Sequence, residues 1–108
     1  MIKAKGFNWF GYFDGMKYNN KTEPFEDYLR LNNKVSKDAV INHIETLEPA
    51  LTSIPTFDIF TGERLEHAGM FIDGLFLFPT DFLHYYKKYD IGIPYEYEEY
   101  LIKNNIVA

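Results

Sequence analysis

Cysteine is absent from this chain, and the motifs of several familiar active sites are missing with it. Without cysteine there are no disulfides, thiolate nucleophiles or zinc–thiolate sites, and the composition fits a reducing compartment. The seven glycines form neither a Gly-x-Gly-x-x-Gly turn nor a Gly-Lys-Ser/Thr phosphate loop. Ser36 and Ser53 lie in no Gly-x-Ser-x-Gly elbow. We therefore expect no cofactor, and no motif identifies a catalytic residue.

Long apolar runs are also absent. Gly6, Asn8 and Asp14 interrupt the segment that follows Lys3 and Lys5, so the apolar core of a secretion signal is not formed. No segment approaches the roughly 20 apolar residues of a membrane-spanning helix. These observations predict a cytoplasmic protein that has no membrane partner.

Positive charge is scarce in the second half of the chain. Residues 1 to 54 hold seven basic and seven acidic side chains, whereas residues 55 to 108 hold four basic and nine acidic ones. The formal net charge of −5 therefore arises entirely after residue 54. Because an acidic surface repels phosphate, we expect no direct nucleic-acid binding. An acidic mimic that occupies the groove of a nucleic-acid binder stays open as an alternative.

The chain is rich in aromatic and aliphatic side chains. Of its 108 residues, 46% are hydrophobic and 19% are aromatic. A chain of this length buries roughly two-thirds of its unfolded surface on folding, which is enough for one core. No linker or low-complexity tract divides the sequence. We predict a small single globular α+β domain over residues 1–108.

The first half of the predicted sheet is indicated by alternation and by an Asp-Gly pair. Ile2 and Ala4 alternate with lysines, as in a strand with one exposed face. An aromatic segment follows, and Asp14-Gly15 interrupts it with residues that tolerate the positive φ of a tight turn. This pattern predicts a β-hairpin over about 2–18.

A second hairpin is predicted over about 56–78. It begins with a strand at 56–60 and the polar turn Thr61-Gly62-Glu63, and it continues into two apolar arms around Asp73-Gly74. These arms do not alternate, so we expect that helices or another sheet cover both of their faces, or else that one face binds a partner. The apolar arms of both hairpins are also able to pair across a two-fold axis, which leaves a homo-oligomer open.

Three to four short helices complete the predicted fold, over about 23–31, 36–48, 81–90 and 95–103. Ser36 is placed as the N-cap of the second helix, and Pro49 ends that helix. Thr80 or Asp81 caps the third helix, and Pro94 opens the fourth.

Six of the nine tyrosines lie within sixteen residues, with three glutamates among them. They are Tyr85, Tyr86, Tyr89, Tyr95, Tyr97 and Tyr100, together with Glu96, Glu98 and Glu99. Helical spacing puts most of these tyrosines on core faces, whereas Tyr85 and Tyr95 fall elsewhere. We predict that Tyr85, Tyr95, Glu96 and Glu99 form a partner-binding patch, because tyrosine suits recognition surfaces and carboxylates favour a basic partner. The alternative is an aromatic core with an incidental acidic rim.

These features favour a small interaction protein of the inhibitor, immunity or adaptor type that binds a basic protein. An enzyme is the alternative that rests on the histidines. Asp81 and His84 are three residues apart on a predicted helix, and His67 is a possible third ligand, as a metal site or an acid–base pair needs. Such i, i+3 pairs are common on solvated helix faces. His43 is expected at the edge of the core with a hydrogen-bond partner.

Overall fold

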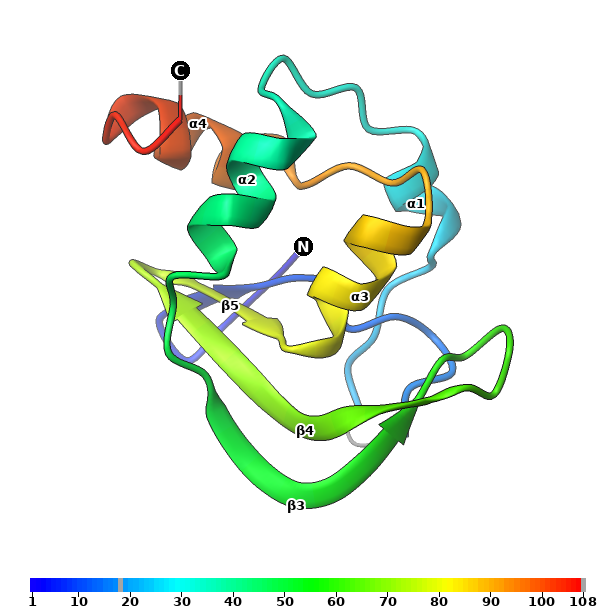
Figure 1. Cartoon of the computed structure of the whole chain (residues 1–108). Coiled ribbons are helices and arrows are strands. Elements are labelled where there is room, and N and C mark those ends of the chain that lie inside the picture. The colour runs from blue at the N-terminus through cyan, green and yellow to red at the C-terminus, as the bar shows by residue number, and fades with distance from the viewer. Residues whose placement is uncertain (18, 108) are drawn as a thin grey trace.

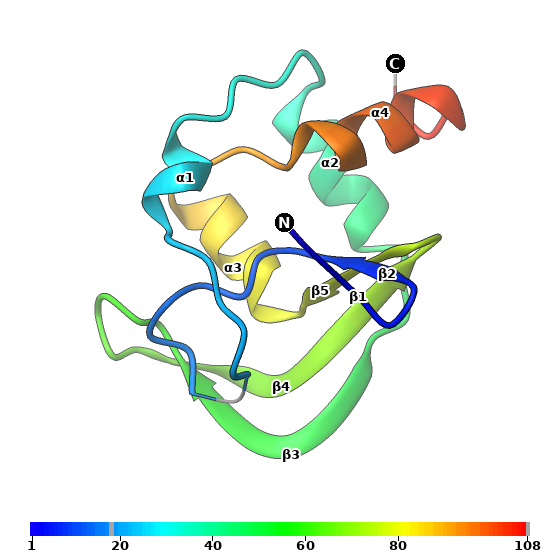
Figure 2. The ribbon, with the colours of Figure 1, turned by 180° about the vertical axis from the view of Figure 1, so that it is seen from behind.

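The computed structural model describes residues 1–17 and 19–107, with every side chain among them except that of Glu66. Four helices lie above a five-stranded sheet, and the side of the sheet below β3 and β4 has no helix over it (Figures 1 and 2). The elements, in chain order, are β1 (Ile2–Ala4), β2 (Phe7–Trp9), α1 (Glu26–Leu29), α2 (Lys37–Ile44), β3 (Ala50–Phe57), β4 (Arg64–Asp73), β5 (Phe76–Pro79), α3 (Asp81–Lys88) and α4 (Tyr95–Lys103). This is the predicted α+β class.

The strand order is β1-β2-β5-β4-β3, so β1 and β3 form the two edges of the sheet. All neighbouring strands are antiparallel except β2 and β5, which run parallel, with Asn8 opposite Phe76 and Trp9 opposite Leu77. Among the described residues, no helix is long and apolar enough to cross a membrane.

The first hairpin differs from the prediction in the position of its turn. β1 and β2 are joined at Lys5-Gly6, where both residues have positive φ (54° and 81°). The predicted tight turn at Asp14-Gly15 is present, since the Met16 amide donates to the Phe13 carbonyl oxygen (3.1 Å). It lies in a loop and not between two strands, and the Asp14 amide closes this loop by donating to the Glu23 carbonyl oxygen (2.8 Å). The prediction of one hairpin over 2–18 is therefore wrong, because the aromatic segment after β2 leaves the sheet and enters the core. Tyr18, its predicted end, lies outside the described residues.

The second predicted hairpin is confirmed around Asp73-Gly74. Its first strand, predicted at 56–60, is placed wrongly, because β3 ends at Phe57 and residues 58–60 form a loop around the Asp58 carboxylate. Asp73-Gly74 joins β4 to β5, with Gly74 at a φ of 61°, and Thr61-Gly62-Glu63 lies in the turn between β3 and β4. β3 begins at Ala50, earlier than the predicted start at 56. Pro55 lies within this strand, which is tolerated because β3 is at the edge of the sheet.

The predicted helices are present, although their ends are shorter in places. At the start of α2, the Ser36 hydroxyl accepts a hydrogen bond from the Ala39 amide (3.3 Å), which confirms the predicted cap. α3 begins at Asp81 without a side-chain cap, so the prediction that Thr80 or Asp81 caps it is wrong. The reason is that the Asp81 carboxylate faces the sheet, where it accepts a hydrogen bond from the Thr56 hydroxyl.

The core between the sheet and the helices is mainly aromatic. Its largest fully buried side chains include Phe10, Phe13, Phe78, Phe82, Tyr85 and Tyr97. Phe10 stacks on Phe78, with ring centres 4.7 Å apart. Gly11 permits this packing, because a Cβ there would come within 2.7 Å of the Phe82 ring. Most of the apolar side chains of the two predicted hairpins are thus covered within one chain.

Candidate functional site

The predicted partner-binding patch is divided between the core and the surface. Tyr85 in α3 is fully buried, with 0% of its surface exposed. Its ring packs on Phe13 and Tyr89, and its hydroxyl accepts a hydrogen bond from the Ile59 amide (2.9 Å). Burial raises the pKa of Tyr85 to about 12. The prediction that Tyr85 is exposed is wrong, because the loop after β3 covers the face of α3 that the helical pattern left to solvent.

The other three residues of the patch lie at the surface of α4. Tyr95 is 50% exposed, and Glu96 and Glu99 are also exposed. The Tyr95 hydroxyl has an internal role as well, since it accepts a hydrogen bond from the Asn32 amide (3.0 Å). The patch is reduced to Tyr95, Glu96 and Glu99, and its role in binding stays a prediction.

Glu98, between these residues in the sequence, is buried and holds the connection between α1 and α2. Its carboxylate accepts hydrogen bonds from the amides of Lys34 (2.6 Å) and Val35 (3.1 Å). Beside it, the Asn33 side chain donates to the Ile93 carbonyl oxygen and accepts from the Ile93 amide. Part of the acidic tyrosine segment is therefore structural.

Several other carboxylates are internal too. Among the side chains that the structure describes, five acidic ones are buried: Glu23, Asp58, Asp73, Asp81 and Glu98. Four of these belong to the second half of the chain, whereas the basic side chains of that half, Arg64, Lys87, Lys88 and Lys103, are all exposed. The acidic excess seen in the sequence is therefore much weaker at the surface. Buried carboxylates cannot contribute to the exposed row that a nucleic-acid mimic needs.

Asp58 follows β3 and forms the centre of one hydrogen-bond cluster. One carboxylate oxygen accepts from the amides of Phe60 (2.7 Å) and Thr61 (3.0 Å), and the other accepts from the Tyr89 hydroxyl (2.9 Å) and lies 2.7 Å from His84 Nε2. Burial alone would raise the pKa of Asp58, but the hydrogen bonds from His84, the two amides and Tyr89 outweigh it and hold the pKa well below its usual range. The charged Asp58 thus fixes the loop after β3 on α3.

Asp58, Glu63 and His84 also form a group of potential metal ligands, since their ligand atoms lie within 4.8 Å of one another. Lys88 lies at the same place, with its Nζ 3.2 Å from Glu63 Oε1 and 3.9 Å from Asp58 Oδ2. The Lys88 ammonium therefore already supplies a positive charge next to these carboxylates. We assign this arrangement a structural role as an ion-pair network.

Asp81 and His84 do not form the joint site that their spacing suggested. Asp81 is buried and accepts a hydrogen bond from the Thr56 hydroxyl (2.9 Å), whereas His84 pairs with Asp58. Both residues and His67 line an open groove of about 800 Å³. Asp81, His84 and His67, on which the enzyme alternative rests, thus line one groove. Of these three, His84 alone belongs to the group of potential metal ligands with Asp58 and Glu63 among the described residues.

A second buried aspartate, Asp73, forms a separate cluster at the turn between β4 and β5. Its Oδ2 lies 2.7 Å from His43 Nε2 and accepts from the Tyr97 hydroxyl (2.7 Å), and its Oδ1 accepts from the Tyr100 hydroxyl (3.3 Å). Burial, followed by the hydrogen bond to Asp73, raises the pKa of Tyr97 above its usual range. The expected hydrogen-bond partner of His43 is confirmed. This cluster ties the turn to α2 and α4.

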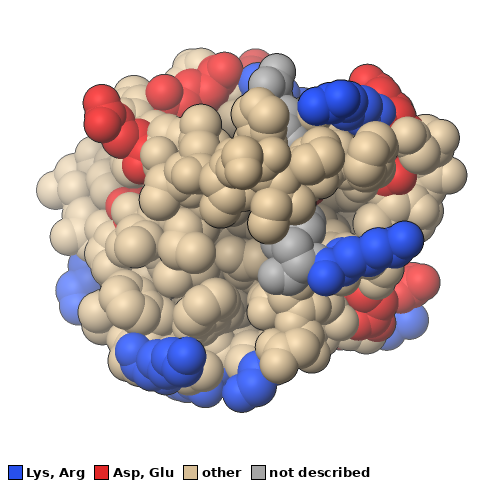
Figure 3. All heavy atoms as spheres, turned by 90° about the horizontal axis from the view of Figure 1, so that it is seen from below, with Lys and Arg blue, Asp and Glu red and all other residues tan. Residues whose placement is uncertain are grey.

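The sequence reasoning missed the free edge of the sheet. Within residues 1–17 and 19–107, β4 is the single strand that pairs with β3, and none of the eight residues of β3 is charged. Leu51, Ile54 and Phe57 in this strand, and Phe60 just after it, are 52% to 60% exposed. Seen from below, charged side chains lie mainly toward the rim of this side of the molecule and its middle is largely uncharged (Figure 3).

A signal for this edge was present in the sequence. The run from Ala50 to Phe57 has no charge and contains two threonines and an isoleucine, which are typical of strands. Pro49 and Pro55 concealed it, because prolines so close together indicate turns unless the strand is known to lie at an edge.

No known protein family, curated protein or solved structure matches this chain. The function is therefore argued from the side chains themselves.

Proposed function

We propose that this protein is a protein-binding module that takes up an extended apolar segment of a partner along the free edge of β3. The observation that carries the proposal is the uncharged, eight-residue strand Ala50–Phe57, which has a strand neighbour on only one side among the described residues. Edge strands usually carry charges or are covered, because their unpaired backbone groups otherwise pair with other chains. A partner strand added beside the first residues of β3, from Ala50 to Ser53, would pair with backbone groups at this edge.

Pro55 separates the part of β3 where backbone pairing with the partner is expected from the part where side-chain contacts are expected. Proline has no backbone N–H, and the register between β3 and β4 shifts on both sides of Pro55. Backbone pairing with the partner is therefore expected mainly along the first half of β3. Side-chain contacts are expected to dominate along the second half.

The second half of β3 borders a groove of about 600 Å³ that suits such side-chain contacts. Ile54 and Phe57 line it from the strand, and Met16 and Lys17 line it from the loop after Asp14-Gly15. Because side chains alternate along an extended segment, every second residue of the partner would reach this groove. An apolar residue at these positions of the partner fits the exposed rings and aliphatic chains.

The basic character of the partner remains part of the proposal. The net charge of −5 attracts a basic protein over long distances and speeds the encounter, while the apolar edge supplies the contact. Higher salt is then expected to slow association more than it speeds dissociation.

The experiment is affinity capture from lysate of the source organism, followed by calorimetric titration of the captured partner against variants. Ile54→Lys with Phe57→Lys should weaken binding by about tenfold or more, because it puts two charges into the apolar contact. Leu75→Lys is the matched control, since Leu75 is an equally exposed apolar residue in the turn between β4 and β5. It should bind as the wild type does.

A third variant, Glu96→Lys with Glu99→Lys, tests the reduced patch on α4. If this variant loses the partner and the β3 variant keeps it, the proposed surface is wrong and the patch is the contact. Sedimentation of the protein alone tests self-pairing. A dimer that the β3 variant abolishes would mean that the segment added to β3 is another copy of this chain.

A further inference from the structure

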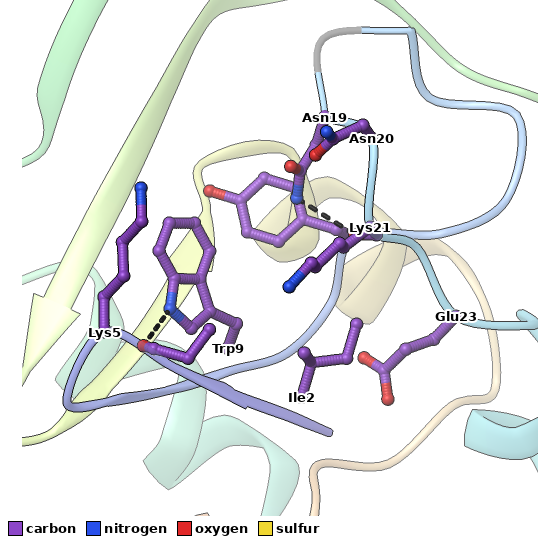
Figure 4. A pocket seen from close by; sticks show the side chains of 9 residues that line it. Ile2, Lys5, Trp9, Asn19, Asn20, Lys21 and Glu23 are labelled. Atoms are coloured by element: carbon purple, nitrogen blue, oxygen red, sulfur yellow. Dashed lines mark hydrogen bonds between the residues drawn. The ribbon is translucent and has the colours of Figure 1, made fainter.

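A cavity of about 230 Å³ lies near the β1 edge of the sheet, opposite to β3, between the β1–β2 hairpin and the segment that leads to Glu23 (Figure 4). The rings of Trp9 and Tyr12 line it, with ring centres 5.9 Å apart, and Ile2 adds an aliphatic wall. The volume is below the roughly 300 Å³ at which pockets for drug-sized molecules begin. A ligand of one or two rings fits this size.

The Trp9 side chain is held in a fixed orientation. Its indole N–H donates a hydrogen bond to the Ala4 carbonyl oxygen (3.0 Å), across the turn of the β1–β2 hairpin. The N–H is therefore engaged within the protein, and the ring itself is the part of Trp9 that contacts the cavity. Flat aromatic surfaces favour a planar ring, by stacking or by edge-to-face packing.

Two lysines give the cavity a positive charge. Lys5 and Lys21 both line it and lie on opposite sides of the Trp9 ring in Figure 4. No carboxylate forms an ion pair with either of them among the residues that the structure describes. The chain has a net charge of −5, so these two lysines form a locally positive region on a negatively charged protein.

Glu23 is the carboxylate that lines the cavity, and its oxygens are engaged elsewhere. One oxygen accepts hydrogen bonds from the Tyr28 hydroxyl (2.8 Å) and the Gly11 amide (3.3 Å), and the other is bound by the N-terminal ammonium of Met1. The Met1 ammonium balances the charge of Glu23, and the two neutral donors satisfy its other oxygen. The Lys5 and Lys21 ammonium groups are left to bind an anion.

We propose that this cavity binds a small planar aromatic molecule that carries one anionic group. The ring packs on Trp9 and Tyr12, and the anionic group is attracted by the Lys5 and Lys21 ammonium groups that lie on either side of the Trp9 ring. This site shares no lining residue with the groove beside β3, although the chain between Asp14 and Glu23 contributes to both.

The test uses three probes of equal ring size and different charge, namely 2-naphthoate, 2-naphthalenemethanol and 2-naphthylmethylamine. Trp9 is the only tryptophan, so its single indole N–H signal in a ¹H–¹⁵N NMR spectrum reports on this cavity alone. We expect 2-naphthoate to shift the signal saturably, with a dissociation constant of about 1 mM for a ligand of this size. The alcohol should bind more weakly, and the amine more weakly still.

Charge-removing variants connect the binding to the two lysines. The double variant is Lys5→Asn with Lys21→Gln, because asparagine tolerates the positive φ of residue 5. It should weaken 2-naphthoate binding by about fivefold and leave the alcohol unaffected. Lys3→Gln removes one positive charge from an exposed neighbour that does not line the cavity, and this variant should bind 2-naphthoate as the wild type does.

Three results would overturn the proposal. They are the absence of a saturable shift with 2-naphthoate, equal affinity for the three probes, and unchanged affinity in the double variant. A separate result on the partner surface would leave this site standing, because neither set of variants touches the other site.

Discussion

The two buried aspartates have the same kinds of partner but hold the molecule together in different ways. Asp58 and Asp73 each lie close to a histidine on a helix and each accept a tyrosine hydroxyl. Asp58 also accepts two backbone amides of its own loop, whereas the second tyrosine of the Asp73 cluster, Tyr100, takes that place. One carboxylate therefore shapes a loop and the other joins helices to a turn.

The difference shows that a histidine beside an aspartate is not by itself a catalytic signal. Both pairs have a nitrogen-to-oxygen distance of 2.7 Å, as an oriented general base would. In both pairs, the aspartate also accepts hydrogen bonds from groups of the surrounding structure. These are the Phe60 and Thr61 amides and the Tyr89 hydroxyl at Asp58, and the Tyr97 and Tyr100 hydroxyls at Asp73. The hydrogen bonds around each carboxylate, and not the pair alone, indicate its role.

The largest expected effect is that of removing the Asp58 carboxylate. Asp58→Ala should lower the free energy of unfolding by about 3 kcal/mol, because the amides of Phe60 and Thr61 and the Tyr89 hydroxyl lose their acceptor. Asp73→Ala removes the acceptor of side-chain donors only, namely the Tyr97 and Tyr100 hydroxyls, and should lower the free energy of unfolding by about 2 kcal/mol. Urea unfolding of both variants measures the order, and a larger loss for Asp73→Ala would contradict the distinction drawn between the clusters.

A smaller effect is expected within the Asp73 cluster itself. Tyr97→Phe should cost about 1.5 kcal/mol, because Tyr97 is fully buried and its hydroxyl is 2.7 Å from the carboxylate. Tyr100→Phe removes the same group at 3.3 Å from a less buried position, and about 0.5 kcal/mol is expected. Equal losses in urea unfolding would show that burial does not set the strength of these two bonds.

A further prediction concerns the pH dependence of the Asp58 cluster. The folded-state pKa of Asp58 is lowered, so its contribution to stability is complete above the unfolded value of about 3.9 and is lost as the pH falls through the folded value. Between about pH 6 and pH 3, wild type should lose about 1 kcal/mol more stability than Asp58→Asn, which cannot titrate. Parallel pH profiles for the two proteins would show that another carboxylate determines the acid sensitivity.

Local signals in the sequence predicted much of the fold. The helix at Ser36 and the turn at Asp73-Gly74 depend on residues close to one another in the chain, and both are present. The turn at Lys5-Gly6 was missed because lysine seldom adopts positive φ, so Asp14-Gly15 was the stronger pattern.

The candidate sites depend on contacts between distant segments, and these were less predictable. Asp58 and His84 are neighbours only because the loop after β3 folds over α3, and the same loop buries Tyr85. Helical periodicity describes the faces of α3 but does not specify what covers each face. The exposed positions of Tyr95, Glu96 and Glu99 were predicted correctly because the helical spacing of Tyr97 and Leu101 identifies the buried face of α4.

The parallel pairing of β2 with β5 has a consequence for the order of events during synthesis. The β1–β2 hairpin leaves the ribosome well before its neighbour in the sheet, Phe76–Pro79, which is among the last parts of the sheet to be made. Since non-local pairings form slowly, the aromatic segment that follows β2 stays uncovered while the middle of the chain is translated. The nascent chain is therefore expected to be a chaperone client until β5 and α3 emerge and enclose Phe10 and Phe13.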